Sequence, residues 1–394
     1  MNINTQAILR QIENSNPEHF RLLEEYRVVM HEWALQADLT GEIPQDFWSV
    51  APVDLLNRIN IPVAYGGIEM TATALQRAVL FERIGEICPS LPISMPGPGL
   101  SMPPVLHLGT EEQKQAYLQR FLDRDIPVWG AFAITEPGCG SDATALKATA
   151  TLEGDDYLLN GEKCFITNGA RAEVVVAFVN AYPSKGRFGI RAFVVPTNTP
   201  GFKINRCEDM LGLRSSQLTH LSFTDCRVPK EYMLGHNGKR GPLIDAFTGA
   251  QHAWDFMRPV LSSVINGSCI GIINHARQLL QTSQVEITST GQETVIARLD
   301  AFTARCQSSR LMSLRAAHSY DQQQRSSTYA SIAKAFASTT AMELAHFLAS
   351  TFPLQAMQKN NPIEKFYRDA KGFDILEGTG DMQRLMIAKA KSAA

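Results

Sequence analysis

The stretch of sequence that decides the fold is WGAFAITEPGCGSD, residues 129–142. Its apolar run at residues 131–134 predicts a buried strand, which ends where Pro137 removes a backbone hydrogen-bond donor. The glycines that follow allow the loop to turn and to approach a ligand closely. Thr135 and Ser141 add hydroxyl groups beside backbone N–H groups that no neighbouring strand would use. This apolar floor with a polar rim suits a flat polar ring, and the simpler interpretation is a strand-to-loop corner.

A second polar stretch, NGEKCFITNG at residues 160–169, follows a predicted β-hairpin. The hairpin strands are expected at residues 148–152 and 157–159, with a turn at residues 153–156 between them. Together the two stretches resemble the "TEPGxGSD" and "NGxKxxITNG" motifs of the acyl-CoA dehydrogenase family. In that family the motifs hold the two ends of the FAD isoalloxazine ring. The resemblance extends through nearly the whole chain and is closest to the medium-chain type of enzyme.

Composition limits the classes of protein to which the chain can belong. Its 394 residues are 44% hydrophobic and 19% charged with a net charge of −2, so we expect a sizeable core and no nucleic-acid-binding face. The seven cysteines show no C-x-x-C pair and no metal-ligand spacing, which indicates reduced thiols and a cytoplasmic protein. The polar N-terminus predicts no signal peptide, and the lack of a long apolar stretch predicts no membrane span.

The periodicity of the sequence changes twice, which predicts three domains. Residues 1–127 have helical spacing, apart from the proline-rich residues 92–104, which we expect to be irregular. Residues 128–236 have short β-branched runs that predict a small antiparallel barrel or sandwich. Residues 237–394 return to long helices and predict a four-helix bundle, after a flexible connector at residues 235–242. The fold class is α+β, and the resemblance implies the acyl-CoA dehydrogenase fold with FAD between the last two domains.

The resemblance also implies which residues contact the cofactor. Phe132 stands where an aromatic residue is common, and Phe165 stands where the family has an aromatic ring beside the flavin. The implied FAD-binding residues are Phe132, Ile134, Thr135, Gly140, Ser141, Phe165, Ile166, Thr167 and Thr379.

The segment FDILEGTGDMQR, residues 373–384, precedes the last predicted helix. Taken alone, Glu377 is a carboxylate stabilised by the helix N-terminus, with Thr379 as N-cap. In the family an "EGT" segment before "QR" carries the catalytic base, and Glu377 has that position. The implied reaction is α,β-desaturation of an acyl thioester, in which Glu377 removes the α-proton while a hydride passes from the β-carbon to flavin N5.

This reaction makes three demands on the site. The carboxyl group needs a raised pKa, which burial against apolar surface would provide. The thioester carbonyl needs hydrogen bonds, which by resemblance come from the backbone N–H of Glu377 and a ribityl hydroxyl of the flavin. The acyl chain must lie between the flavin and the carboxylate so that both C–H bonds are aligned.

The substrate-binding residues implied by the resemblance are Ser141, Asp255, Arg258 and Gly378. Asp255 and Arg258 stand in WDFMRP, where the family has a "D-x-x-R-P" helix near the thioester and its pantetheine. Arg258 could instead orient the base or form an interhelical salt bridge. The segment STYASIAKAFA at residues 327–337 also matches the family, and we interpret it as packing rather than chemistry.

Three departures from the family pattern fall on the AMP half of FAD. Gln281 and Gln284 replace an Arg and a Phe that the family contributes across the dimer, and Arg277, one turn earlier, could supply the charge. Pro353 stands in a segment that lacks the family's glycines, and Asp381 replaces a Gln. Because an aspartate facing a pyrophosphate is unfavourable, we expect reduced FAD retention.

The leading hypothesis is an FAD-dependent acyl-thioester dehydrogenase. Its substrate would be carried by CoA or an acyl carrier protein, and its electrons would pass to an electron-transfer flavoprotein. The family assembles through the C-terminal bundle, so we expect a homodimer or homotetramer. Two alternatives stay open, namely a flavin oxidase or monooxygenase on the same fold and a cofactor-poor, non-catalytic subunit of a heteromer.

Overall fold

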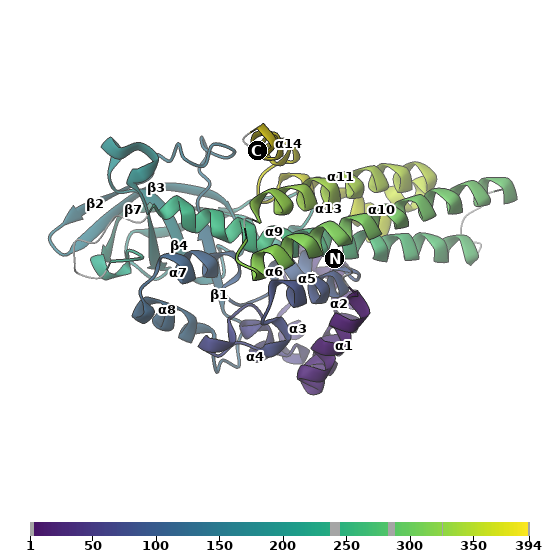
Figure 1. The fold of residues 1–394 in the computed structure, drawn as a ribbon, viewed down its shortest axis with the longest axis horizontal. Helices are drawn as coiled ribbons and strands as arrows, with labels where there is room; N and C mark the ends of the chain where they lie inside the picture. Colours follow the sequence, from purple (N-terminus) through teal and green to yellow (C-terminus); the bar gives the residue numbers. More distant parts are fainter. Residues whose placement is uncertain (1–3, 237–244, 283–287, 325, 393–394) are drawn as a thin grey trace.

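The structure is a computed structural model that describes residues 4–236, 245–282, 288–324 and 326–392 (Figure 1). Most of the predicted connector lies at residues 237–244, outside the described residues. Helices, a β-sheet and long helices follow one another in the predicted order. The N-terminal helices are α1 (Thr5–Ser15), α2 (Pro17–Thr40), α3 (Gln45–Val50), α4 (Val53–Arg58), α5 (Ala74–Gly85), α6 (Ser90–Ser94), α7 (Met102–Leu108) and α8 (Glu111–Leu118).

Local sequence signals set the ends of the N-terminal helices. Thr110 and Gln113 form a reciprocal capping box at the start of α8. The prediction for residues 92–104 is confirmed only at residues 95–98, because α6, a 3-10 turn at Gly99–Ser101 and α7 occupy the rest of this proline-rich segment. Pro103 and Pro104 lie in the first turn of α7, where the missing N–H groups would have no partner within the helix.

The central domain is a seven-stranded sheet that curls around its own core. The β2–β3 hairpin turns at Gly154, whose φ of +66° favours glycine. Strands β1 and β4 are parallel, so the sheet is mixed rather than wholly antiparallel as predicted. The strand order is β1-β4-β2-β3-β7-β6, with β5 beside β4. The strands are β1 (Trp129–Ala133), β2 (Thr149–Glu153), β3 (Asp156–Ile166), β4 (Ala172–Asn180), β5 (Ile190–Pro196), β6 (Phe202–Cys207) and β7 (Thr219–Pro229).

The long helix α9 is the centre of the C-terminal domain. It packs against α5, α10 and α11, and it runs from beside the sheet into the bundle (Figure 1). Contrary to the sequence-based expectation, α9 is long and apolar enough to cross a membrane, with a mean hydropathy of 1.4 over 18 residues. Since 83% of that window is buried inside the protein, α9 is accounted for as a core helix. The C-terminal helices are α9 (Ala246–Gln281), α10 (Ser289–Asp321), α11 (Ser327–Thr351), α12 (Pro353–Met357), α13 (Pro362–Ile375) and α14 (Gly380–Ser392).

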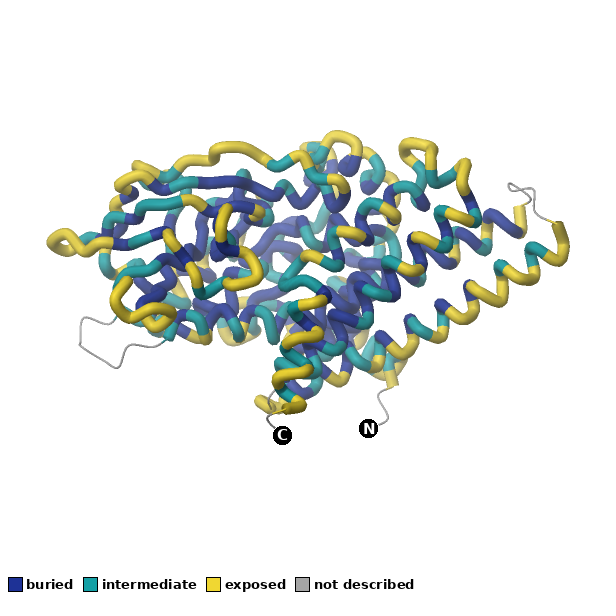
Figure 2. Tube along the Cα trace, turned by 90° about the horizontal axis from the view of Figure 1, so that it is seen from above, coloured by how far each residue is buried: buried dark blue, intermediate teal, exposed yellow. Residues whose placement is uncertain are grey.

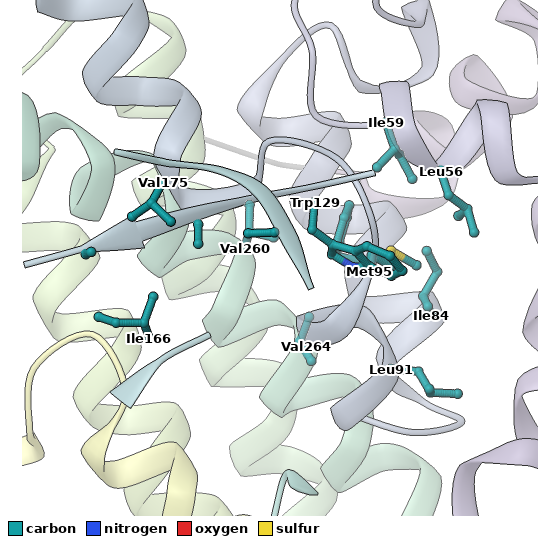
Figure 3. Packing of buried hydrophobic residues seen from close by; sticks show 14 of the residues in the cluster. Leu56, Ile59, Ile84, Leu91, Met95, Trp129, Ile166, Val175, Val260 and Val264 are labelled. Carbon is teal, nitrogen blue, oxygen red and sulfur yellow. The ribbon is translucent and has the colours of Figure 1, made fainter. Parts of the chain in front are cut away.

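A shared apolar core joins the three parts of the chain. One cluster contains Leu91 from α6, Trp129 from β1, Ile166 from β3 and Val260 from α9 (Figure 3). The Trp129 indole Nε1 also donates to the carbonyl oxygen of Ser94 at 3.0 Å. Figure 2 shows that buried residues continue from the sheet into the helices. The strands that carry the two motifs therefore share one apolar core with α9.

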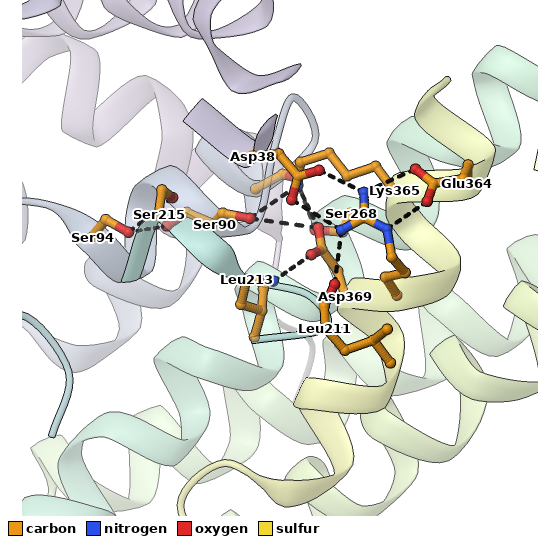
Figure 4. A network of polar contacts seen from close by, with 12 residues as sticks. Asp38, Ser90, Ser94, Leu211, Leu213, Ser215, Ser268, Glu364, Lys365 and Asp369 are labelled. Carbon is orange, nitrogen blue, oxygen red and sulfur yellow. Dashed lines mark hydrogen bonds and ion pairs between the residues drawn. The ribbon is translucent and has the colours of Figure 1, made fainter. Parts of the chain in front are cut away.

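A buried polar network also connects the domains (Figure 4). Asp369 on α13 accepts a hydrogen bond from the backbone N–H of Leu213 at 2.6 Å and pairs with Lys365. Arg368 binds Asp38 of α2 through both terminal nitrogens. Because buried charges need their partners, this network fixes the β-domain and the N-terminal helices against α13.

Candidate active site

The first motif forms a tight turn at the end of β1. The backbones of Glu136 and Cys139 exchange two hydrogen bonds of 3.1 and 3.0 Å. Ile134 is buried beneath the turn, whereas Gly140 and Ser141 are exposed beyond it. The hydroxyl groups of Thr135 and Ser141 make no hydrogen bond to another described residue. This is the apolar floor with a polar rim that the sequence predicts.

The second motif is bonded directly to the first. The backbone N–H of Cys164 on β3 donates to the carbonyl oxygen of Thr135 at 2.9 Å. Lys163, which is fully buried, donates to the carbonyl oxygen of Ile134 at 3.1 Å and to the carboxylate of Glu136 at 2.7 Å. Glu136 also accepts the backbone N–H groups of Lys147 and Ala148. These contacts hold the ends of β1 and β3 as one unit.

An irregularity in β3 turns an aromatic ring out of the core. The register with β7 shifts between Lys163 and Ile166, and Phe165 has a φ of +56°. As a result the Phe165 ring is 56% exposed, whereas Ile166 beside it is buried. Phe132 on β1 is half-buried against Phe178, with ring centroids 5.1 Å apart. The exposed ring and the free hydroxyls, including that of Thr167, form a face suited to a flat aromatic ligand.

Glu377 lies in a short loop between α13 and α14. Its φ is +53° and that of Gly378 is +94°, so both residues have left-handed backbone. Thr379 caps α14 as predicted, since its hydroxyl accepts the N–H of Met382 at 3.3 Å. The backbone N–H of Glu377 donates to no described residue. The loop therefore presents one free N–H group beside the carboxyl group.

Three buried side chains bind the carbonyl oxygens of this loop. Arg258 Nε of α9 donates to the oxygen of Glu377 at 3.1 Å. Gln383 Nε2 of α14 donates to the oxygens of Glu377 and Gly378 at 3.1 and 3.0 Å. Lys334 Nζ of α11 donates to the oxygens of Asp374 and Gly378, each at 2.8 Å. The backbone around Glu377 is thus held from three helices.

The Glu377 carboxyl group titrates close to neutral pH. Burial raises the pKa of Glu377 from 4.5 to about 7, against the opposing charges of Arg258 and Lys334. Three buried polar atoms at this loop have no hydrogen-bond partner among the described residues, namely Glu377 Oε2, Arg258 Nη1 and Gln383 Oε1. Such unpaired atoms are costly in a closed protein and indicate a ligand-binding site.

Arg258 and Asp255 have different surroundings although they share α9. Arg258 donates to the carbonyl oxygen of Glu377 and forms no ion pair among the described residues, so the interhelical salt bridge considered above is not present. Asp255 accepts a hydrogen bond from Gln251 of the same helix at 3.0 Å and one from Ser327 at 2.6 Å, and the second bond ties α9 to the start of α11. The structure therefore brings Arg258, Gly378 and Glu377 together and directs Asp255 toward α11.

The site predicted from the sequence did not include two of the residues that surround this loop. Lys334 lies in the segment that we interpreted as packing, and Gln383 was noted only as part of the terminal motif. The available signal for Lys334 was a single lysine within the apolar and small residues of 327–337. A charged residue at such a position must find a buried partner.

The segments expected at the AMP half of FAD offer few phosphate ligands. Arg277 pairs with Asp300 at 2.7 Å, so its guanidinium group already has a partner within this chain. Pro353 begins α12, which leaves Leu354 79% and Met357 85% exposed. Asp381 is 98% exposed and pairs with Arg384. Gln281 ends α9, and Gln284 lies outside the described residues. Among the described residues, the face formed by the two motifs suits the isoalloxazine ring, and the segments expected at the AMP half offer few groups that could bind phosphate.

The fold and this site together define the acyl-CoA dehydrogenases, and the chain belongs to that family. Residues 19–125, 131–226 and 247–391 match the N-terminal, middle and C-terminal domains of acyl-CoA dehydrogenases, respectively. The family is FAD-dependent, and the chain is an oxidoreductase of the acyl-CoA dehydrogenase type that acts on CH–CH donors.

Individual relatives agree with this assignment. The chain is 33% identical to cyclohex-1-ene-1-carbonyl-CoA dehydrogenase of Geobacter metallireducens over 341 residues, which cover 86% of this chain and 87% of that protein. It is 33% identical to human mitochondrial short-chain specific acyl-CoA dehydrogenase, over 84% of this chain and 78% of that protein. The butyryl-CoA dehydrogenase structure from Megasphaera elsdenii superimposes with a TM-score of 0.85 at 26% identity, over 99% of each chain. These relatives are named for cyclic and short acyl groups rather than for the medium-chain type that the motifs resemble.

Proposed function

We propose that the chain dehydrogenates an acyl-CoA thioester at its α,β bond with Glu377 as the base. The α-proton passes to the Glu377 carboxylate, the β-hydrogen leaves as a hydride, and a carbon–carbon double bond forms. Bound FAD would supply the hydride acceptor. The observation that carries the proposal is the buried carboxyl group with a pKa of about 7 and an unpaired Oε2.

Proton transfer at an α-carbon depends on the state of this carboxyl group. A base with a pKa of about 7 is ionised in useful amounts at neutral pH and still holds the proton well once it has taken it. A carboxylate with the usual pKa of about 4 would be a much weaker base. Substrate that covers the loop would exclude water and raise the pKa further.

The thioester carbonyl would bind at the backbone N–H of Glu377. Arg258 and Gln383 hold the carbonyl oxygen of the same residue on the other side of the loop. This arrangement orients the N–H before substrate arrives, so little reorganisation is needed as negative charge develops on the thioester oxygen. By family resemblance a ribityl hydroxyl of the cofactor would provide the second hydrogen bond.

The flavin ring would lie on the face formed by the two motifs. We assign its contacts to the free hydroxyls of Thr135, Ser141 and Thr167 and to the exposed ring of Phe165. Phe132, Ile134, Ile166 and Gly140 complete this face, and Thr379 would contact the cofactor from the other side. The AMP half would be held weakly by this chain, or through a partner subunit of a homodimer or homotetramer.

We propose CoA as the carrier, because the relatives at 33% identity are named as CoA-thioester dehydrogenases. Electrons would leave the reduced cofactor for an electron-transfer flavoprotein. An acyl carrier protein as substrate donor is an outcome that the following test also detects.

The test is anaerobic bleaching of the flavin absorbance by a panel of short, cyclic and medium-chain acyl-CoA and acyl-carrier substrates. The protein with excess FAD should bleach with at least one acyl-CoA, and Glu377→Gln should bleach at least ~1,000-fold more slowly, in line with loss of a general base and its alignment. Equal bleaching by the variant would refute the assignment of the base. Rapid oxygen consumption by the reduced protein would favour an oxidase instead.

One observation favours a second candidate, a cofactor-poor subunit of a heteromer. Pro353 removes one backbone N–H group at the start of its segment, which forms a helix with exposed apolar residues. If the purified protein stays colourless when FAD is added, this second function is preferred.

A further inference from the structure

One buried cation in the helical domain is not explained by packing. Lys334 is 0% exposed in the middle of α11. The residues one turn away along the helix are small and buried, namely Ala330, Ser331, Ala337 and Ser338. Enclosing an ammonium group is costly unless acceptors replace its water. The two acceptors that Lys334 binds lie on either side of Glu377, one in the last turn of α13 and one in the loop that follows it.

The ammonium group of Lys334 binds the backbone on both sides of Glu377. Lys334 Nζ lies 2.8 Å from the carbonyl oxygen of Asp374, in the last turn of α13, and 2.8 Å from that of Gly378. Between these two acceptors the backbone has the left-handed φ of +53° at Glu377. A non-glycine residue keeps such a conformation only where its surroundings impose it. Lys334 is the one side chain that binds both ends of this turn among the described residues.

Lys334 also contributes charge to the site. It and Arg258 are the cations that oppose the effect of burial on the pKa of Glu377. The opposite charges of Asp374 and Glu377 raise the pKa of Lys334. The like charges of Arg258 and Arg384 lower it. Burial lowers the pKa of Lys334 to about 8, so the ammonium is protonated at neutral pH.

We propose that Lys334 is a positioning residue for the base. It fixes the loop between Asp374 and Gly378 so that the Glu377 carboxyl group faces the substrate, and it adds a positive charge at that loop. This proposal rests on the proposed function, in which Glu377 accepts the α-proton. It assigns a role in the reaction to a segment whose pattern alone indicates helix packing.

Four variants separate charge, hydrogen bonding and packing. Lys334→Met keeps the length of the side chain and removes the charge and both hydrogen bonds. Lys334→Gln can still donate to one carbonyl oxygen, and Lys334→Arg keeps the charge. Ser331→Ala is the matched control, since Ser331 is buried on the same helix and its hydroxyl has no partner.

The first measurement needs no substrate turnover. In the FAD-bound protein labelled with δ-¹³C glutamate, the Glu377 signal is identified by its absence in Glu377→Gln and followed with pH. We expect its midpoint to rise by about 1 unit in Lys334→Met and Lys334→Gln, the usual effect of losing an opposite charge at close range. The midpoint should stay near the wild-type value in Lys334→Arg and Ser331→Ala.

The second measurement is the pH profile of kcat/KM. The acid limb should move up with the ¹³C midpoint, and kcat at pH 7 should fall at least ~10-fold in Lys334→Met while KM changes little, as expected when the base is misplaced. A wild-type protein that turns over no thioester would overturn the proposed function, and the ¹³C titration would still decide the effect of Lys334 on Glu377.

The proposal is overturned if folded Lys334→Met titrates Glu377 at the wild-type midpoint with kcat within twofold of wild type. If Lys334→Met does not fold, Lys334→Gln decides in its place by the same criterion. A loss of rate in Ser331→Ala equal to that in Lys334→Met would also overturn it, because the effect would then belong to the helix rather than to the ammonium group.

Discussion

The buried carboxyl group of Glu377 should make the protein less stable as the pH rises. The pKa of Glu377 is about 7 in the folded protein and 4.5 without its surroundings, so the folded state binds the proton more tightly. The stabilising effect of that proton is fully present below pH 4.5 and is lost as the pH rises through 7. Glu377→Gln removes the ionisation and should therefore become progressively more stable than wild type across this window.

The size of the loss in unfolding free energy follows from the pKa shift of Glu377. Each pKa unit corresponds to 1.36 kcal/mol, so a rise from 4.5 to about 7 gives an upper value of about 3 kcal/mol above pH 7. The side chain is only half-buried as a whole, which reduces the expected value to about 2 kcal/mol. About a quarter of this free-energy difference is already present at pH 5. The advantage of Glu377→Gln should thus be about 1.5 kcal/mol greater at pH 8 than at pH 5.

Equilibrium urea unfolding at pH 5 and pH 8, with the same excess of FAD throughout, measures this difference. The control is Glu293→Gln, which changes an exposed glutamate on α10 and should run parallel to wild type. If wild type and Glu377→Gln keep a constant difference in unfolding free energy at both pH values, the carboxyl group does not titrate as a buried group and the reasoning fails.

Three further changes test other parts of the site. Glu136→Gln removes the negative charge that pairs with the buried ammonium group of Lys163, so the free energy of unfolding should fall by about 3 kcal/mol in urea unfolding, and an unchanged value would contradict the role of this pair. Phe165→Ala removes a ring that is 56% exposed, so stability should change by less than about 0.5 kcal/mol while FAD affinity falls in a fluorescence titration, and equal affinity would show that the ring does not touch the flavin. Gln281→Arg adds a cation at the end of α9 and should slow the loss of FAD during dialysis, whereas wild-type protein that already keeps all its flavin would refute the expected weak binding of the AMP half.

Much of the architecture could be predicted because its signals are local. The apolar run before Pro137 predicts β1, and the hairpin ahead of residues 160–169 predicts β2 and the start of β3. Thr110 and Gln113 define the start of α8 through contacts within one turn. The family motifs then extend these local predictions to the order of the domains.

Other features depend on contacts that no local pattern contains. Strand β6 (Phe202–Cys207) has mostly exposed residues, so it lacks the alternation that marks a strand. The parallel pairing of β1 with β4 is decided by the path of the chain through the hairpin between them. The partners of Lys334 lie 40 and 44 residues further along the chain, so its role was visible only once α11 and the loop at Glu377 were placed together.

The left-handed backbone at Glu377 has a consequence for how this sequence can drift. Glycine adopts a φ of +53° without steric cost, whereas a glutamate there is strained by roughly 1 kcal/mol or more. A gene copy released from selection for turnover could therefore exchange this glutamate for glycine and gain stability twice, from the relaxed backbone and from the lost buried charge. We therefore expect an inactive paralogue to lose this glutamate, because stability favours the exchange and only selection for catalysis opposes it.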